Sequence, residues 1–320
     1  MKKNNLLKVA LFMSLCSTSA QAYKISVYTD QPDQSKAQEV INTFKNTYPF
    51  NQYDIEYEVK SVQASQLNCK ADAAIARLPE CDTHAIVLDA AQRGVSQAII
   101  VKDNPIYGGS GGAIPVVTTG SPASVAVHEY MHTLGLSDEY QYSASEAVIY
   151  CKSVSSPNLA FIEPNPNGYQ NDSSARSQHM GHIPWGEFIK SETPITHSGG
   201  TLLGTDGVNH DMYATPNSTG APSRMGSSVG LYEGKTCKSA VPPLKTWQPG
   251  REASIMEFVA AGLGAGNEMS IAKALESRGV RRKTPLPENT SSAINTEARG
   301  NKAIQNEDNS KSTGTNTISR

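Results

Sequence analysis

Two histidines four residues apart carry the clearest chemical signal in the chain. His128 and His132 stand in the string HEYMH, and Glu129 directly follows the first of them. Residues four positions apart on a helix lie on one face, so the two imidazoles can share a metal ion. In that arrangement Glu129 is not a ligand but the base that takes a proton from the attacking water. Two ordinary surface histidines would show the same spacing, so the flanking residues decide between these interpretations.

The residues after the second histidine supply a candidate third ligand. Catalytic zinc sites use three protein ligands and leave a fourth position open. Gly135 follows His132 by three residues, and Asp138 follows Gly135 by three more. Glycine tolerates the left-handed backbone conformation that turns a chain sharply after a helix. The spacing therefore predicts a zinc site made of His128, His132 and Asp138, although Asp138 could instead be a solvated loop carboxylate.

The string from His128 to Asp138 resembles the extended zinc motif of metzincin peptidases, in which the third ligand is usually histidine. With aspartate in that position it is similar to small secreted bacterial metzincins of the snapalysin type. The continuation GLSDEY at 135–140 also resembles the IgA-peptidase-like metallopeptidases, whose motif is one residue longer. That difference in register leaves Glu139 as a second candidate for the third ligand.

The resemblance is specific over Ser121–Tyr140 and weaker over Tyr232–Phe258. It implies a secreted zinc metalloendopeptidase that hydrolyses protein or peptide substrates with Glu129 as general base. A zinc-containing binding or adhesion protein with a vestigial site is the alternative. An intact Glu129 argues against it, because a binding protein has no use for a base there.

Metzincins also place a methionine-containing turn beneath the metal. The segment SIMEF at 254–258 resembles that turn, particularly its astacin form, and it follows WQPG, which is similar to the IgA-peptidase-like group. Met256 would then be a soft apolar floor below the histidines. Met225, in the string RMGS, is the alternative, and either methionine could simply fill the core.

Astacins carry a tyrosine two residues after this methionine, where it helps to stabilise the oxyanion. Here that position is Phe258. Tyr232 is the first substitute for the role and Tyr140 the second, while a buried structural tyrosine is the ordinary interpretation of both. His179 and His182 form a weaker candidate for a second metal site, since no carboxylate cluster accompanies them.

Local signals place the zinc motif on a helix. Ser121 is a good N-cap and Pro122 suits the first helical turn, so a helix should run to about Leu134 and end at Gly135. Before it, the pattern predicts one helix and several strands, in chain order a strand at 24–28, a helix at 34–48, and strands at 53–62, 84–88, 98–101 and 113–118.

These elements indicate an α+β fold with a mixed-sheet lobe and a loop-rich second lobe. The resemblance implies that this fold is a metzincin-like zincin and that the helix with the two histidines is its active-site helix. The glycine run at 108–112 reads as a hairpin tip or a mobile rim, and Pro115 favours an edge position for the strand after it. Further helices are expected at 252–261 and 269–277.

The chain has 320 residues and a formal charge of −2. Residues 1–22 read as a signal peptide, with three lysines, a short apolar run and the cleavage pattern Ala-Gln-Ala. Its removal would leave a charge of −5 and a catalytic domain at 23–280, followed by a polar, disordered tail at 281–320. No later segment is apolar enough to span a membrane. The absence of a basic surplus argues against nucleic-acid binding.

Export gives meaning to the four cysteines that lie beyond the signal peptide. An even count in an oxidising compartment predicts two disulfides. We favour Cys69 with Cys81 and Cys151 with Cys237, although the sequence alone permits three pairings. The expected product is a monomeric secreted or periplasmic enzyme.

Overall fold

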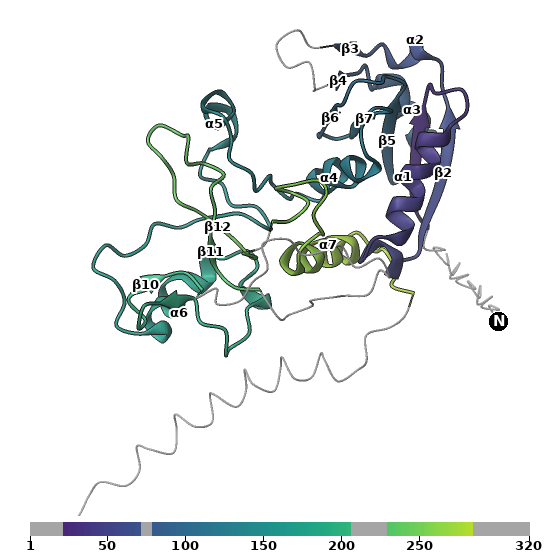
Figure 1. Ribbon diagram of the computed structural model, residues 1–320. Coiled ribbons are helices and arrows are strands. Elements are labelled where there is room, and N and C mark those ends of the chain that lie inside the picture. The colour runs from purple at the N-terminus through teal and green to yellow at the C-terminus, as the bar shows by residue number, and fades with distance from the viewer. Residues whose placement is uncertain (1–21, 72–78, 206–228, 252, 284–320) are drawn as a thin grey trace, which may run out of the picture. The chain divides into compact units, whose positions relative to one another are not determined.

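The computed structural model describes residues 22–71, 79–205, 229–251 and 253–283. They form two compact units, the first from residues 22–41 and 55–133 and the second from 42–54 and 134–283 (Figure 1). Nearly all of the predicted signal peptide, most of the predicted tail and Met225 lie outside the described residues. None of the described helices is both long and apolar enough to cross a membrane.

The first unit combines helices with a mixed sheet, in agreement with the expected α+β class. Its helices are α1 (Ser35–Asn46, which continues into the second unit), α2 (Ala64–Leu67), α3 (His84–Gln92) and α4 (Ala123–Thr133). Its strands are β1 (Tyr23–Thr29), β2 (Ile55–Ser61), β3 (Lys70–Ala71), β4 (Pro79–Glu80), β5 (Gln97–Lys102), β6 (Gly109–Ser110) and β7 (Val116–Thr118).

Five of these strands form one sheet in the order β2-β1-β5-β7-β6. The first four run parallel, and β6 joins the edge antiparallel to β7. One face of the sheet packs on α3, where Tyr28 and Ile100 meet Ile86 and Ala90. The glycine run that suggested a hairpin tip therefore contributes the edge strand of the sheet.

The opposite face of the sheet carries the helix with the two histidines. Side chains alternate along a strand, so Tyr23, Ile25 and Val27 share the face that α3 does not cover. The hydroxyl groups of Tyr23 and Tyr130 share a buried hydrogen bond of 3.0 Å, which joins β1 to α4 on this face. Helix α4 also packs against β6 and β7.

The second unit contains short elements joined by long loops. Its helices are α5 (Ala144–Tyr150), α6 (Asp172–His179) and α7 (Ala265–Ser277), together with single 3-10 turns at Phe50–Gln52, Met180–His182 and Gly186–Phe188. Its strands are β8 (Ala160–Phe161), β9 (Thr196–His197), β10 (Leu202–Leu203), β11 (Tyr232–Glu233) and β12 (Thr246–Gln248).

Two tryptophans centre the core of the second unit. Trp185 and Trp247 are buried with aliphatic residues from several loops. Their indole N–H groups donate to the carbonyl oxygens of Gly230 and Ile162, at 2.7 and 2.8 Å. Each ring therefore buries a large apolar area and also satisfies its polar atom, which fixes loops that have little regular structure of their own.

Two disulfides join the cysteine pairs that the sequence analysis favoured. Cys69 is bonded to Cys81 in the first unit, and Cys151 to Cys237 in the second. Two such bonds are consistent with a protein that folds in an oxidising compartment.

Three predicted elements were wrong. Residues 84–88 begin helix α3 rather than a strand, with Ile86 and Ala90 buried one helical turn apart and Leu88 half exposed. Strand β7 is interior, because β6 pairs with its outer side. Pro115 lies before the strand and not within it, so it does not prevent this pairing. The described residues at 253–261 form turns instead of a helix.

Candidate metal centre

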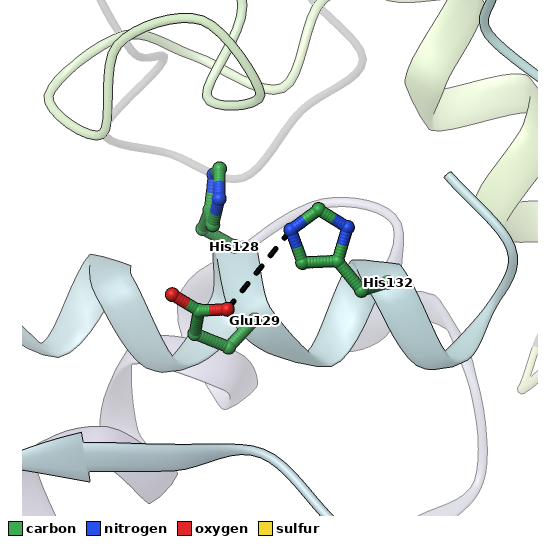
Figure 2. A group of neighbouring side chains, drawn as sticks. All are labelled: His128, Glu129 and His132. Atoms are coloured by element: carbon green, nitrogen blue, oxygen red, sulfur yellow. Dashed lines mark ion pairs between the residues drawn. The ribbon is translucent and has the colours of Figure 1, made fainter. Parts of the chain in front are cut away.

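Helix α4 brings the two histidines and the glutamate of the motif together. Ligand atoms of His128, Glu129 and His132 all lie within 4.8 Å of one another. Figure 2 shows the three side chains on neighbouring turns of the helix, with Nε2 of His132 3.9 Å from Oε2 of Glu129. Within the described parts of the chain, this is the group of histidine, cysteine and acidic side chains arranged to hold a metal ion.

The environment of these side chains suits metal binding. His128 and Glu129 are buried, with relative exposures of 6% and 8%, and His132 is partly exposed. The two imidazole rings meet edge to face with centroids 4.9 Å apart. Two imidazole nitrogens beside a carboxylate form a donor set that divalent transition metals favour. The residues present therefore fit a metal ion. The partial exposure of His132 leaves the site accessible from that side.

The turn after the helix has the backbone conformation expected from the glycine. Helix α4 ends at Thr133, and Gly135 has a φ angle of +91°. A side chain at this position would be strained in that region of backbone space. Gly135 therefore ends the helix and redirects the chain toward Asp138, as the sequence predicted.

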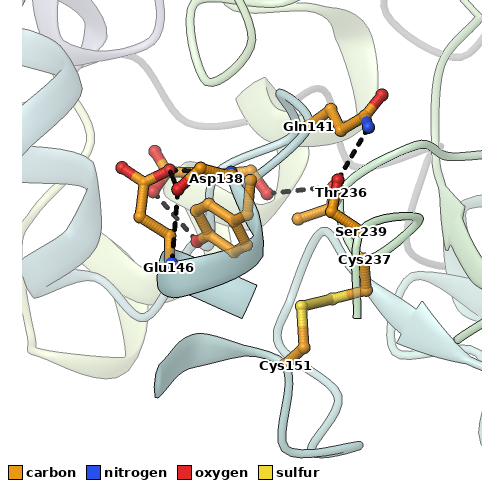
Figure 3. The surroundings of a disulfide bond; sticks show 9 residues. Asp138, Gln141, Glu146, Cys151, Thr236, Cys237 and Ser239 are labelled. Carbon is orange, nitrogen blue, oxygen red and sulfur yellow. Dashed lines mark hydrogen bonds between the residues drawn. A yellow bond between two sulfur atoms is a disulfide. The ribbon is translucent and has the colours of Figure 1, made fainter. Parts of the chain in front are cut away.

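Asp138 lies in the second unit, where neighbouring groups hold it in place. Its Oδ2 accepts a hydrogen bond of 3.0 Å from the hydroxyl of Tyr142. Thr236, the residue before Cys237, donates to the carbonyl oxygen of Asp138 and accepts from the backbone N–H of Tyr142. Figure 3 shows this segment beside the disulfide between Cys151 and Cys237, and the hydrogen bond from Thr236 joins Asp138 to a residue 98 positions further along the chain.

Glu139, the second candidate for the third ligand, has a structural role that the sequence analysis did not predict. Its side chain is 2% exposed, and both carboxylate oxygens accept hydrogen bonds. Asn158 and Asn267 donate to Oε1 at 2.8 and 3.1 Å, and the hydroxyl of Ser254 donates to Oε2. Burial raises the pKa of the Glu139 carboxyl, although these three donors oppose the shift.

The Glu139 network fixes the methionine turn. The backbone N–H of Glu139 donates to the carbonyl of Met256 at 2.9 Å, and Met256 donates its own N–H to the hydroxyl of Ser254 at 3.0 Å. Met256 is fully buried, and Phe258 closes the turn by donating to the carbonyl of Ser254. The turn at 254–258 is thus anchored to the residue directly after Asp138.

Replacing Glu139 by Ala should destabilise the protein by about 3 kcal/mol. The change leaves the buried donors of Ser254, Asn158 and Asn267 without their acceptor and also opens a cavity. Chemical denaturation measured by tryptophan fluorescence would give the free energy of unfolding. Glu163→Ala, at an exposed glutamate, is the matched control and should change stability by no more than about 0.5 kcal/mol. Equal stability of both variants and the parent would show that the Glu139 network contributes nothing.

The remaining candidates occupy ordinary structural positions. Tyr232 is buried in β11, opposite Gln248 of β12, and Tyr140 packs edge to face against Tyr142. Phe258, at the position of the astacin tyrosine, is more than half exposed.

The second histidine pair does not behave as a ligand pair. The Nε2 of His179 lies 2.7 Å from the buried hydroxyl of Tyr169, and His182 is exposed. Burial lowers the pKa of His179, and the neighbouring His182 adds to the shift. His179 is thus a buried histidine hydrogen-bonded to a tyrosine, the ordinary structural role of such a residue.

Comparison of the chain with models of known protein families gave no match, and neither did comparison with curated proteins. The case for a function therefore rests on the residues and geometry described above.

Proposed function

We propose that this protein is an exported zinc metalloendopeptidase of the metzincin type. The observation that carries the proposal is the convergence of His128, Glu129 and His132, whose ligand atoms lie within 4.8 Å of one another on α4. Two histidines one helical turn apart, with a glutamate beside the first, form the arrangement that zinc peptidases use. The disulfides support a location outside the cytoplasm.

His128 and His132 would hold the zinc through imidazole nitrogens, and Asp138 is the proposed third ligand. The positive φ of Gly135 supports the sharp turn that this assignment needs. Glu139 is the poorer candidate, because both of its carboxylate oxygens already accept hydrogen bonds from buried donors. We assign Glu139 instead to anchoring the turn that contains Met256, the proposed floor of the site.

In the proposed reaction Glu129 moves the proton. Zinc, when bound, lowers the pKa of a water ligand toward about 7 and polarises the scissile carbonyl. The Glu129 carboxylate accepts a proton from the attacking water and returns it to the nitrogen of the leaving amine. Its low exposure of 8% keeps bulk water from competing for that proton. Tyr232 remains the first proposed partner for the oxyanion, and Tyr140 the second.

Digestion of denatured protein tests this function. We expect the zinc-loaded protein to cut internal peptide bonds, a strong zinc chelator to stop the cutting, and added zinc to restore it. Mass mapping of new termini distinguishes endopeptidase from exopeptidase activity. Stoichiometric zinc without any new termini would favour a binding protein with a vestigial site. Cleavage that is insensitive to chelation would exclude the proposed mechanism.

A further inference from the structure

Gly109 on strand β6 and Gly111, just after that strand, lie directly against the proposed base and one proposed ligand. A Cβ atom built on Gly109 would lie 2.7 Å from Oε1 of Glu129 and 2.6 Å from Cγ1 of Val125. A Cβ atom built on Gly111 would lie 2.9 Å from Cδ2 of His132. Real Cβ atoms essentially never lie this close to another heavy atom, so the backbone at 109 and 111 approaches these two groups as closely as only glycine allows.

Backbone conformation does not require glycine at either position. Gly112 and Gly135 have positive φ angles, whereas Gly109 and Gly111 do not. Alanine could therefore adopt the same backbone at 109 and 111 without strain. The need for glycine at these two positions is one of space alone.

The strand cannot easily move away from the helix. Gly109 pairs with Val117 in the sheet. The backbone N–H of Gly108 donates to the hydroxyl of Ser121 at 2.9 Å, and that hydroxyl donates back to the carbonyl of Gly108 at 2.7 Å. Ser121 precedes helix α4, so this reciprocal pair fixes the approach to β6 against the start of the helix.

An added methyl group must therefore be accommodated by the side chains of α4. At position 109 the mobile group is the Glu129 carboxylate, because Val125 is branched and buried. At position 111 it is the His132 side chain, whose Cβ and Cγ would each lie 3.3 Å from the new atom. Each glycine thus sets the position of a different part of the site.

We propose that Gly109 and Gly111 are positioning residues with separate roles, Gly109 for the general base and Gly111 for the metal ligand. The proposal rests on the function proposed above, in that it assigns Glu129 and His132 those roles. It predicts that a methyl group added at position 109 impairs proton transfer, whereas one added at position 111 impairs metal binding.

The variants Gly109→Ala and Gly111→Ala test the proposal. Gly111→Ala should weaken zinc binding by about 10- to 100-fold in a competition titration, because a displaced imidazole costs about as much as losing its orienting partner. Gly109→Ala should keep full zinc affinity and lower kcat by about 100-fold with little change in KM, the cost of misplacing a reacting group by about 1 Å. Gly181→Ala, where an added Cβ meets nothing within 4 Å, is the matched control.

A second measurement does not depend on activity. In protein labelled with ¹³C at glutamate carboxyl carbons, the Glu129 resonance is identified by its loss in Glu129→Gln. That resonance should shift in Gly109→Ala and stay in place in Gly181→Ala. If the parent protein binds zinc but cleaves nothing, the proposed function fails, while the titration and the NMR spectrum still decide the roles of the glycines.

Unfolding of Gly109→Ala would be resolved with Gly109→Ala/Val125→Ala. This double variant removes the contact with Cγ1 of Val125 and keeps the contact with Glu129. The proposal is overturned if the Glu129 resonance is unchanged in the folded variant and Gly111→Ala binds zinc as tightly as the parent. It is also overturned if both glycine variants lose zinc affinity and kcat to the same degree.

Discussion

Replacing Glu129 by Gln should abolish peptidase activity while the protein keeps its zinc. Glutamine has nearly the volume of glutamate, so the packing of the buried side chain against β6 should survive. Its amide cannot accept and return a proton, and loss of a general base costs about 10²- to 10⁴-fold in rate. Peptide cleavage followed by mass spectrometry, with zinc measured by elemental analysis in the same sample, gives both quantities.

A conservative change at a remote glutamate controls for this experiment. Glu163 is exposed in the second unit, and Glu163→Gln should leave zinc content and rate unchanged. Activity of Glu129→Gln within a few-fold of the parent would rule out Glu129 as the base. Loss of zinc from the same variant would instead make Glu129 a ligand, contrary to the proposed division of roles.

Replacing His132 by Ala should remove the metal. The parent is expected to hold one zinc ion per chain, and a site deprived of one imidazole should weaken by well over about 10²-fold, beyond the cost of losing a partner that merely orients a ligand. Elemental analysis after dialysis should fall from one zinc per chain to none. Peptidase activity should disappear with the metal and should not return when zinc is added at micromolar concentration.

His84→Ala is the matched control, because His84 is an exposed histidine on another helix of the first unit. It should keep one zinc ion per chain. If His132→Ala also keeps its zinc through dialysis, the metal is bound elsewhere and the group on α4 is not the site.

Sequence reasoning predicted the core of the candidate site because its signals are local. The i, i+4 spacing of the two histidines, Pro122 and Gly135 each act within one or two helical turns, and α4 extends from Ala123 to Thr133. The alternating strands β1 and β5 were also predicted, since their apolar residues are contiguous along the chain.

The wrong predictions arose where a short pattern fits two structures. A run such as Ala85 to Leu88 is apolar enough for a buried strand, and only the burial of Ile86 and Ala90 reveals a helix. The interior position of β7 depends on pairing with β6, a strand of only two residues. Propensity does not predict a strand that short.

The network around Glu139 could not be predicted because it joins distant segments. Its donors, Asn158, Ser254 and Asn267, are separated from Glu139 by 19, 115 and 128 residues. The sequence gives no signal for such contacts, and a glutamate beside Asp138 most resembles a second ligand. Only its burial shows that the carboxylate is committed to the fold.

The disulfide between Cys151 and Cys237 has a thermodynamic consequence for the second unit. It closes a loop of 86 residues, and such a closure removes enough freedom from the unfolded chain to favour the native state by about 4 to 5 kcal/mol in the chain-entropy description. That is a large share of the roughly 5 to 15 kcal/mol by which domains are stable. The strands described in the second unit are two or three residues long, so their short hydrogen-bond ladders supply little of the same amount. The folded state of the second unit is therefore substantially more stable when this disulfide is formed. Because the loop with Asp138 belongs to this unit, its order depends in part on a compartment that allows the bond to form.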